Sequence, residues 1–182
     1  MITTPYEIFS ILVVIAAIAY IFSGFVPRKD PYSFKPGWDE IKFAAMVAAP
    51  AVIVHEMFHK FTAMGFGIPA FFQAWWPGLG LGVFLKVVGS SFLIIAPGFV
   101  TMPAIATPVQ STLIAFAGPF ANLIIWLGTT WYLKSKKTFR RKTFLFLMLT
   151  KKINMYLFIF NMLPIPGFDG FHVVSGLWKL FF

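Results

Sequence analysis

The amino-acid sequence predicts an all-α integral membrane protein with about four transmembrane helices and a small membrane-embedded β element between the second and third spans. Hydrophobic residues make up 59% of the 182 residues and charged residues only 12%, about half the charged share of a soluble domain. Apolar runs long enough to cross a bilayer recur along the chain, and basic residues gather between them. A stretch rich in proline and glycine separates two of these runs. We expect one membrane-embedded domain over residues 1–182.

Four spans are expected from the apolar runs. The first run is too long for a cleavable signal peptide, and no basic residue precedes it. In the last span, two prolines and two glycines should unwind the helix and leave backbone groups free. The expected spans are about 8–26, 41–64, 113–133 and 153–180, the last broken near 161–170.

The segment between the second and third spans, residues 65–110, is apolar but cannot be one helix, because it contains five prolines and seven glycines. Residues 83–88 and 92–95 are expected to form short strands. Non-helical backbone at membrane depth is tolerated where protein covers it or where it faces a wet cavity. The segment is therefore expected to line a site, and the alternative is an apolar loop at the membrane interface.

Composition also limits the chemistry. The chain has no cysteine, which excludes disulfides and thiolate ligands, so a metal site must use His, Asp, Glu or water. The net charge is +9, but the basic residues cluster between spans, a pattern typical of membrane topology and contact with lipid headgroups. Nucleic acid is not an expected partner.

The motif His-Glu-x-x-His occupies residues 55–59 in the second expected span. Histidines four residues apart lie on one face of a helix, so His55 and His59 can bind one metal ion, and Glu56 can reach a water molecule on it. The ten preceding residues are all apolar or proline. Ionisable groups in such surroundings are costly and generally functional. The alternative is a buried polar cluster that links helices.

A hydrolytic zinc site needs a third protein ligand. Only Asp169 and His172 remain as candidates after His59. Imidazole is the commoner zinc ligand, which favours His172. Gly167 and Gly170 let the backbone bring a short side chain to the metal, and a carboxylate offsets the charge of the dication, which together favour Asp169. His172 would then lie near the metal without binding it, contact a headgroup, or be a polar residue on the helix surface.

Together these motifs resemble the site-2 protease family of intramembrane zinc metalloproteases. The family pairs His-Glu-x-x-His with a later Asn-x-x-Pro-x-Pro-x-x-Asp-Gly stretch, which here is residues 161–170. Residues 114–122 resemble its Ala-Gly-Pro-x-x-Asn helix, and Pro97-Gly98 and Met102-Pro103 resemble the segment before that helix. The resemblance covers residues 49–172.

The resemblance implies one Zn²⁺ per chain, bound by His55, His59 and Asp169, with Glu56 as the catalytic base. Asn122 and Asn161 would help to position substrate or the oxyanion, and residues 65–110 would form a membrane-embedded sheet. The implied protein is a multi-pass protease of the cell membrane that hydrolyses peptide bonds within or near transmembrane segments. Its implied partners are a transmembrane helix as substrate and the lipid bilayer.

Two other functions are compatible with the same residues. A zinc transporter or channel could use the same histidines and aspartate, but the chain shows no internal repeat and Glu56 has no part in transport. An inactive membrane adaptor is disfavoured because the ligands and the base all match. The distribution of basic residues predicts a zinc nearer the non-cytoplasmic face, whereas the resemblance implies one nearer the cytosol.

Overall fold

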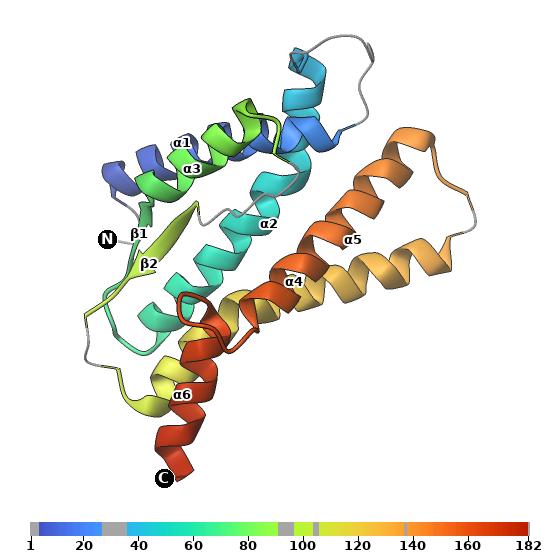
Figure 1. The fold of residues 1–182 in the computed structure, drawn as a ribbon. Coiled ribbons are helices and arrows are strands. Elements are labelled where there is room, and N and C mark those ends of the chain that lie inside the picture. The colour runs from blue at the N-terminus through green and yellow to red at the C-terminus, as the bar shows by residue number, and fades with distance from the viewer. Residues whose placement is uncertain (1–3, 27–35, 91–96, 104–105, 137, 182) are drawn as a thin grey trace. The chain divides into compact units, whose positions relative to one another are not determined.

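The structure is a computed structural model that describes residues 4–26, 36–90, 97–103, 106–136 and 138–181 (Figure 1). Its contacts group the chain into two compact units. The first unit comprises Met1–Pro50 and Phe71–Thr101, and the second comprises Ala51–Ala70 and Met102–Phe182. The prediction of a single domain over the whole chain stays a prediction.

Four helices in the described part of the chain are long and apolar enough to cross a membrane. This agrees with the expected multi-pass membrane fold, and three of the four lie close to their predicted positions. The membrane-length helices are α1 (Pro5–Phe22), which continues into the 3₁₀ turn η1 (Ser23–Phe25), α2 (Trp38–Gly65), α4 (Pro108–Ser135) and α5 (Arg141–Asn161).

The fourth span differs from its prediction at the start. It was expected to begin near residue 153, but α5 begins at Arg141. Six apolar residues, 144–149, separate its basic residues, and long basic side chains can extend along a helix to reach polar surroundings. At the predicted break, α5 ends at Asn161 and α6 (Asp169–Phe181) follows after a non-helical turn. Gly167 in that turn has φ +97°, a conformation that favours glycine.

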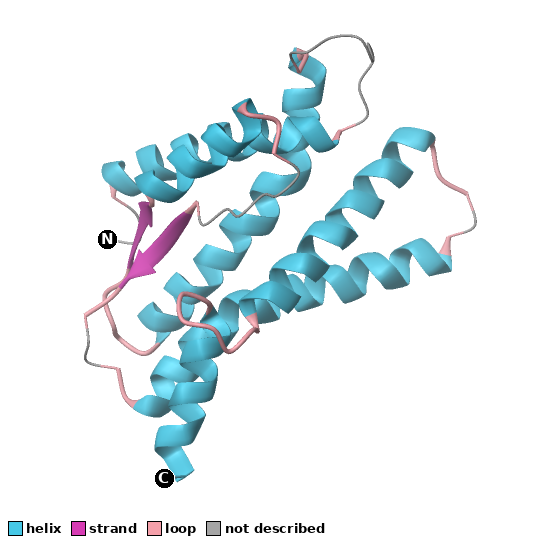
Figure 2. Cartoon of the chain, viewed as in Figure 1, coloured by secondary structure: helices cyan, strands magenta, loops and turns pink. Residues whose placement is uncertain are grey.

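In the first unit, the predicted β element is present but at other residues (Figure 2). The prediction of a strand at residues 83–88 is wrong, because they belong to α3 (Trp76–Val87) and the position after it. Pro77 lies in the first turn of α3, where proline is tolerated, and a helix satisfies its own backbone groups without a partner strand. Gly78 and Gly82 are buried on this helix, and small residues four apart allow close packing of the kind seen between α3 and α1. The other predicted strand, residues 92–95, lies outside the described residues.

The sheet consists of β1 (Phe71–Ala74) and β2 (Gly98–Thr101), paired antiparallel with Phe72 opposite Val100 and Gln73 opposite Phe99. The backbone N–H of Phe72 donates not to β2 but to Glu7 of α1. Phe72 and Val100 therefore form a non-hydrogen-bonded pair of the ladder, in which both residues direct their backbone groups outward. It follows that the outer edge of β2 presents the backbone groups of Val100.

Glu7 connects α1 to this sheet. Its Oε2 accepts a hydrogen bond from the Thr4 N–H at 2.8 Å, and its Oε1 accepts one from the Phe72 N–H at 2.8 Å. The Thr4 side chain in turn accepts from the Glu7 N–H, which completes a capping box at the start of α1. Glu7 is 1% exposed, so this carboxylate in the first turn of α1 is buried.

The second unit contains the C-terminal half of α2 together with α4, α5 and α6. In Figure 1, α5 runs beside α4, and α4 also packs against α6. Thr107 and Gln110 form a capping box at the start of α4, and a Cβ atom placed on Gly176 would collide with the Thr112 hydroxyl. This close approach packs the middle of α6 against α4.

Candidate metal centre

His55 and His59 on α2 and Asp169 at the start of α6 come together in the second unit. The Asp169 Oδ2 atom lies 3.1 Å from His55 Nε2 and 3.4 Å from His59 Nε2. The two Nε2 atoms are 3.1 Å apart. Both histidines are buried and Asp169 is half-buried. Three potential ligand atoms thus meet at one point. His55 and His59 lie one helical turn apart, and Asp169 follows 110 positions after His59.

Hydrogen bonds at the other ring nitrogens orient both histidines. His59 Nδ1 lies 2.7 Å from the carbonyl oxygen of Ile114, and His55 Nδ1 lies 2.6 Å from Asn122 Oδ1. A carbonyl oxygen can only accept, so each Nδ1 carries a proton, and in the neutral imidazole each Nε2 then keeps its lone pair. Such partners of the non-ligating nitrogen are typical of histidines that bind metals. Both Nε2 lone pairs are therefore available on the side of Asp169.

The spacing of these atoms fits a zinc ion. Zinc–nitrogen bonds of about 2.0–2.1 Å place the ligands of a tetrahedral site roughly 3.3 Å apart, and the three observed separations run from 3.1 to 3.4 Å. Two lone pairs and a carboxylate at this distance repel one another unless a cation lies among them. The donor set, two imidazoles and a carboxylate, is one that zinc uses in hydrolytic sites.

Gly118 of α4 provides room at the same place. A Cβ atom there would overlap His59 Nε2 and lie 2.8 Å from His55 Nε2. The space beside both potential ligand atoms therefore exists because residue 118 has no side chain. This glycine lies in the stretch that resembles the Ala-Gly-Pro-x-x-Asn helix, but its packing against the histidines could not be deduced from the sequence.

Glu56, the predicted base, is 9% exposed and follows His55 directly on α2. Asn122 of α4 is fully buried, and its amide group donates to the Ala51 carbonyl at 3.0 Å and to Asn154 Oδ1 at 2.9 Å. Asn161 is the half-buried last residue of α5. The predicted roles of both asparagines toward substrate or oxyanion stay predictions, although both amide hydrogens of Asn122 already have acceptors.

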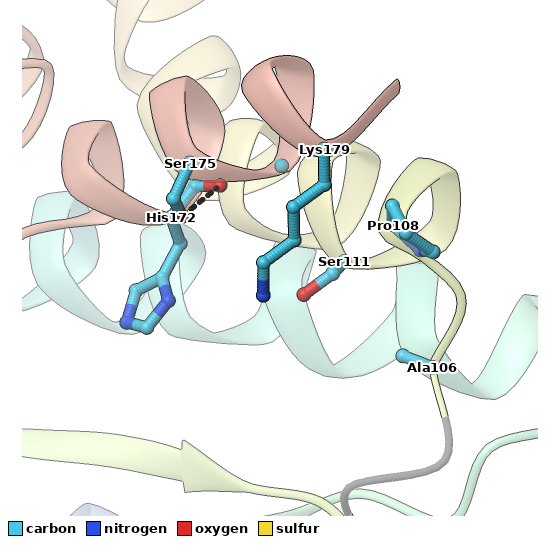
Figure 3. A pocket seen from close by; sticks show the side chains of 7 residues that line it. Ala106, Pro108, Ser111, His172, Ser175 and Lys179 are labelled. Carbon is cyan, nitrogen blue, oxygen red and sulfur yellow. Dashed lines mark hydrogen bonds between the residues drawn. The ribbon is translucent and has the colours of Figure 1, made fainter. Parts of the chain in front are cut away.

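His172 does not join the three potential ligands. It lies three residues after Asp169 on α6, is exposed, and lines a separate pocket of about 140 Å³ (Figure 3). Figure 3 shows its ring beside Lys179, with Ser111 of α4 across the pocket. Of the two candidates left open by the sequence, the structure thus brings Asp169 to the histidines.

Sequence reasoning missed Asn154. It lies in the middle of α5, is 1% exposed, and is hydrogen-bonded to Asn122. An asparagine within the apolar run of a span was an available signal, because such residues usually have a partner inside the protein.

Comparison with known proteins found one relative over most of the chain. A protein of Methanocaldococcus jannaschii that is named a putative zinc metalloprotease is 34% identical over 193 residues, which cover 96% of this chain and 85% of that relative. No family model matches the chain. No solved structure matches it. On this similarity, the chain belongs to the same family as the archaeal protein named as a zinc metalloprotease.

Proposed function

We propose that this protein is an intramembrane zinc metalloprotease of the site-2 protease type, which hydrolyses peptide bonds within or near the transmembrane segments of other membrane proteins in the cell membrane. The observation that carries the proposal is the cluster of His55, His59 and Asp169, whose ligand atoms lie within 4.8 Å of one another. Two of these residues are on α2, a helix long and apolar enough to cross a membrane. The name of the archaeal relative supports the same chemistry.

His55, His59 and Asp169 hold one zinc ion in this proposal. Zinc in such a site activates water at neutral pH and polarises the scissile carbonyl. Glu56 accepts a proton from the attacking water on its carboxylate as the oxygen bonds to the carbonyl carbon. Glu56 then delivers that proton to the amide nitrogen as the carbon–nitrogen bond breaks. His55 and His59 keep their Nδ1 protons throughout, because both nitrogens donate to fixed acceptors.

The two predicted asparagines receive different roles. Asn122 holds His55, because its oxygen accepts from the imidazole and its amide hydrogens are directed to Ala51 and Asn154. Asn161 is the better candidate for donating a hydrogen bond to an oxyanion. It lies at the end of α5, eight residues before Asp169.

A transmembrane substrate must be unwound locally before attack, because helical amides are hydrogen-bonded and shielded. An unwound segment can be held by adding as a strand to a sheet edge. On the β1 side, Glu7 already accepts the outward N–H of Phe72. We therefore assign substrate pairing to the outer edge of β2, where the backbone groups of Val100 are directed away from β1.

The substitution Glu56→Gln tests the chemistry. It should lower cleavage of a reconstituted membrane-protein substrate by roughly 10²–10⁴-fold, the usual contribution of a general base. Zinc content should stay at one per chain, because Glu56 is not a ligand. Zinc content and turnover are measured on the same purified sample.

Three outcomes would contradict this proposal or part of it. Loss of zinc from Glu56→Gln would show that the residue is a ligand instead of the base. Wild-type cleavage that persists in a zinc chelator would overturn the metalloprotease proposal. Zinc flux into vesicles without any cleavage would favour a transporter.

A further inference from the structure

A chain of hydrogen bonds leads from α5 to the metal centre through two buried asparagines. Asn154 Nδ2 donates to the Thr150 carbonyl at 2.8 Å, and Asn154 Oδ1 accepts from Asn122 Nδ2 at 2.9 Å. Asn122 Oδ1 then accepts from His55 Nδ1 at 2.6 Å. Asn122 and Asn154 are 0% and 1% exposed, so water does not compete for these bonds.

The direction of every bond in this chain is set by backbone carbonyls. Thr150 O can only accept, so the NH₂ of Asn154 must face it and the oxygen of Asn154 must face Asn122. Ala51 O and Asn154 Oδ1 are then both acceptors for the NH₂ of Asn122. With its NH₂ held on that side, Asn122 can present only its oxygen to His55. The Nδ1 atom of His55 must therefore carry the proton.

We infer that Asn154 is a positioning residue for the metal centre: acting through Asn122, it holds His55 in the tautomer whose Nε2 can bind zinc. This inference rests on the proposed zinc site. If the Asn122 amide rotated by 180°, its NH₂ would face the imidazole, Nδ1 would have to accept, and Nε2 would carry the proton and lose its capacity to bind metal. Asn154 supplies one of the two acceptors that oppose this rotation, and Ala51 supplies the other.

A merely structural role is the competing explanation, because buried asparagines also hold membrane helices together. The two explanations differ in what they predict for the metal. A structural role predicts a loss of stability that is the same with or without metal. The positioning role predicts a specific loss of metal affinity and a change in the ligand field at the metal.

The test uses the full-length purified protein and three variants. Asn154→Leu removes the acceptor for Asn122, whereas Asn154→Asp retains an oxygen that can face it. Thr112→Val is the matched control, because it deletes another buried hydrogen bond of the second unit, to the Pro108 carbonyl, that does not lead to the site. Zinc affinity is measured by competition with a chelator, and the visible absorption spectrum is recorded after loading with Co²⁺.

Asn154→Leu should weaken zinc binding by roughly tenfold, the lower end of the range for residues that orient a metal ligand. It should also shift the Co²⁺ spectrum. Asn154→Asp should recover most of the affinity, and Thr112→Val should bind zinc as the wild type does. Wild-type affinity and spectrum in Asn154→Leu would overturn the inference and leave the proposed protease activity untouched. If Asn154→Leu weakens zinc binding but the wild-type protein cleaves no substrate, the inference about Asn154 stands and the proposed protease activity fails.

A second measurement covers the case in which Asn154→Leu fails to fold. The ¹⁵N chemical shifts of the His55 ring in metal-free wild-type protein report its tautomer directly. The inference requires the proton on Nδ1. A neutral ring with its proton on Nε2 and none on Nδ1 would overturn it.

Discussion

Each of the two units surrounds a carboxylate with close neighbours, and the partners of the two carboxylates are opposite in kind. Glu7 in the first unit accepts hydrogen bonds from two backbone N–H groups, those of Thr4 and Phe72. Asp169 in the second unit faces the Nε2 atoms of His55 and His59. In the neutral rings those nitrogens carry lone pairs, since Nδ1 on the other side of each ring holds the proton.

This difference separates a structural acid from a functional one. Donors around a carboxylate satisfy it, and Glu7 accepts from two backbone N–H groups. Acceptors around a carboxylate repel it, so Asp169 and its neighbours need a cation to become stable together. Glu7 is buried and Asp169 is half-buried, but it is the chemical nature of the neighbouring atoms that separates their roles.

The largest expected effect is that of Asp169→Ala. Removal of the carboxylate should abolish most zinc binding and all cleavage, because two neutral imidazoles remain to hold a dication. His172→Ala is the matched control on the same helix and should keep zinc and at least part of the activity. Metal analysis of both purified variants is the measurement. The reverse pattern would make His172 the third ligand and remove the contrast between Asp169 and Glu7.

Glu7→Ala should have an intermediate effect: it should lower the stability of the fold and leave metal binding unchanged. It leaves the buried Phe72 N–H without its acceptor, which costs about 1–3 kcal/mol. The midpoint temperature of thermal unfolding in detergent should fall by about 5 °C, and the zinc content should not change. Glu7→Gln retains one side-chain oxygen and should recover part of the loss. Zinc loss in Glu7→Ala at a temperature where the protein is folded would show that the first carboxylate is not purely structural.

The smallest expected effect concerns the edge of β2. Val100→Pro removes one outward N–H, and proline is tolerated on an edge strand when its nitrogen faces away from the partner strand. Loss of about 1 kcal/mol of main-chain pairing should raise KM for substrate about fivefold, with zinc content unchanged. Phe99→Pro should instead destabilise the fold, because that N–H is directed to β1. Equal effects of the two prolines on stability would contradict the assignment of the outer edge.

The residues of the candidate site could be proposed from sequence because their signals are local. A four-residue spacing places His55 and His59 on one helical face in any helix, and Asp169 was one of only two candidates left by elimination. The broken fourth helix was predictable for the same reason, since Pro164, Pro166 and Gly167 determine the backbone around them.

Features that depend on a distant partner could not be predicted in this way. Residues 83–88 have a strand-like pattern, but most of them belong to α3, which packs against α1. The two observed strands pair with each other although 23 residues, 75 to 97, separate them in the sequence. The role inferred for Asn154 depends on Asn122 of another helix, and the space at Gly118 depends on the histidines of α2. The sequence can show that Asn154 is a polar residue in an apolar run, but it does not show which residue on another helix Asn154 or Gly118 contacts.

The hydrogen bond from His59 to the carbonyl of Ile114 has a consequence for the evolution of this site. Every amino acid supplies the same backbone carbonyl, so no exchange of the side chain at position 114 deletes the acceptor that orients His59. The equivalent support of His55 consists of two side chains, Asn122 and Asn154, and either can be lost through a single codon change. Among descendants of this gene, positions 122 and 154 should therefore change together or not at all, whereas position 114 can drift as far as its packing permits.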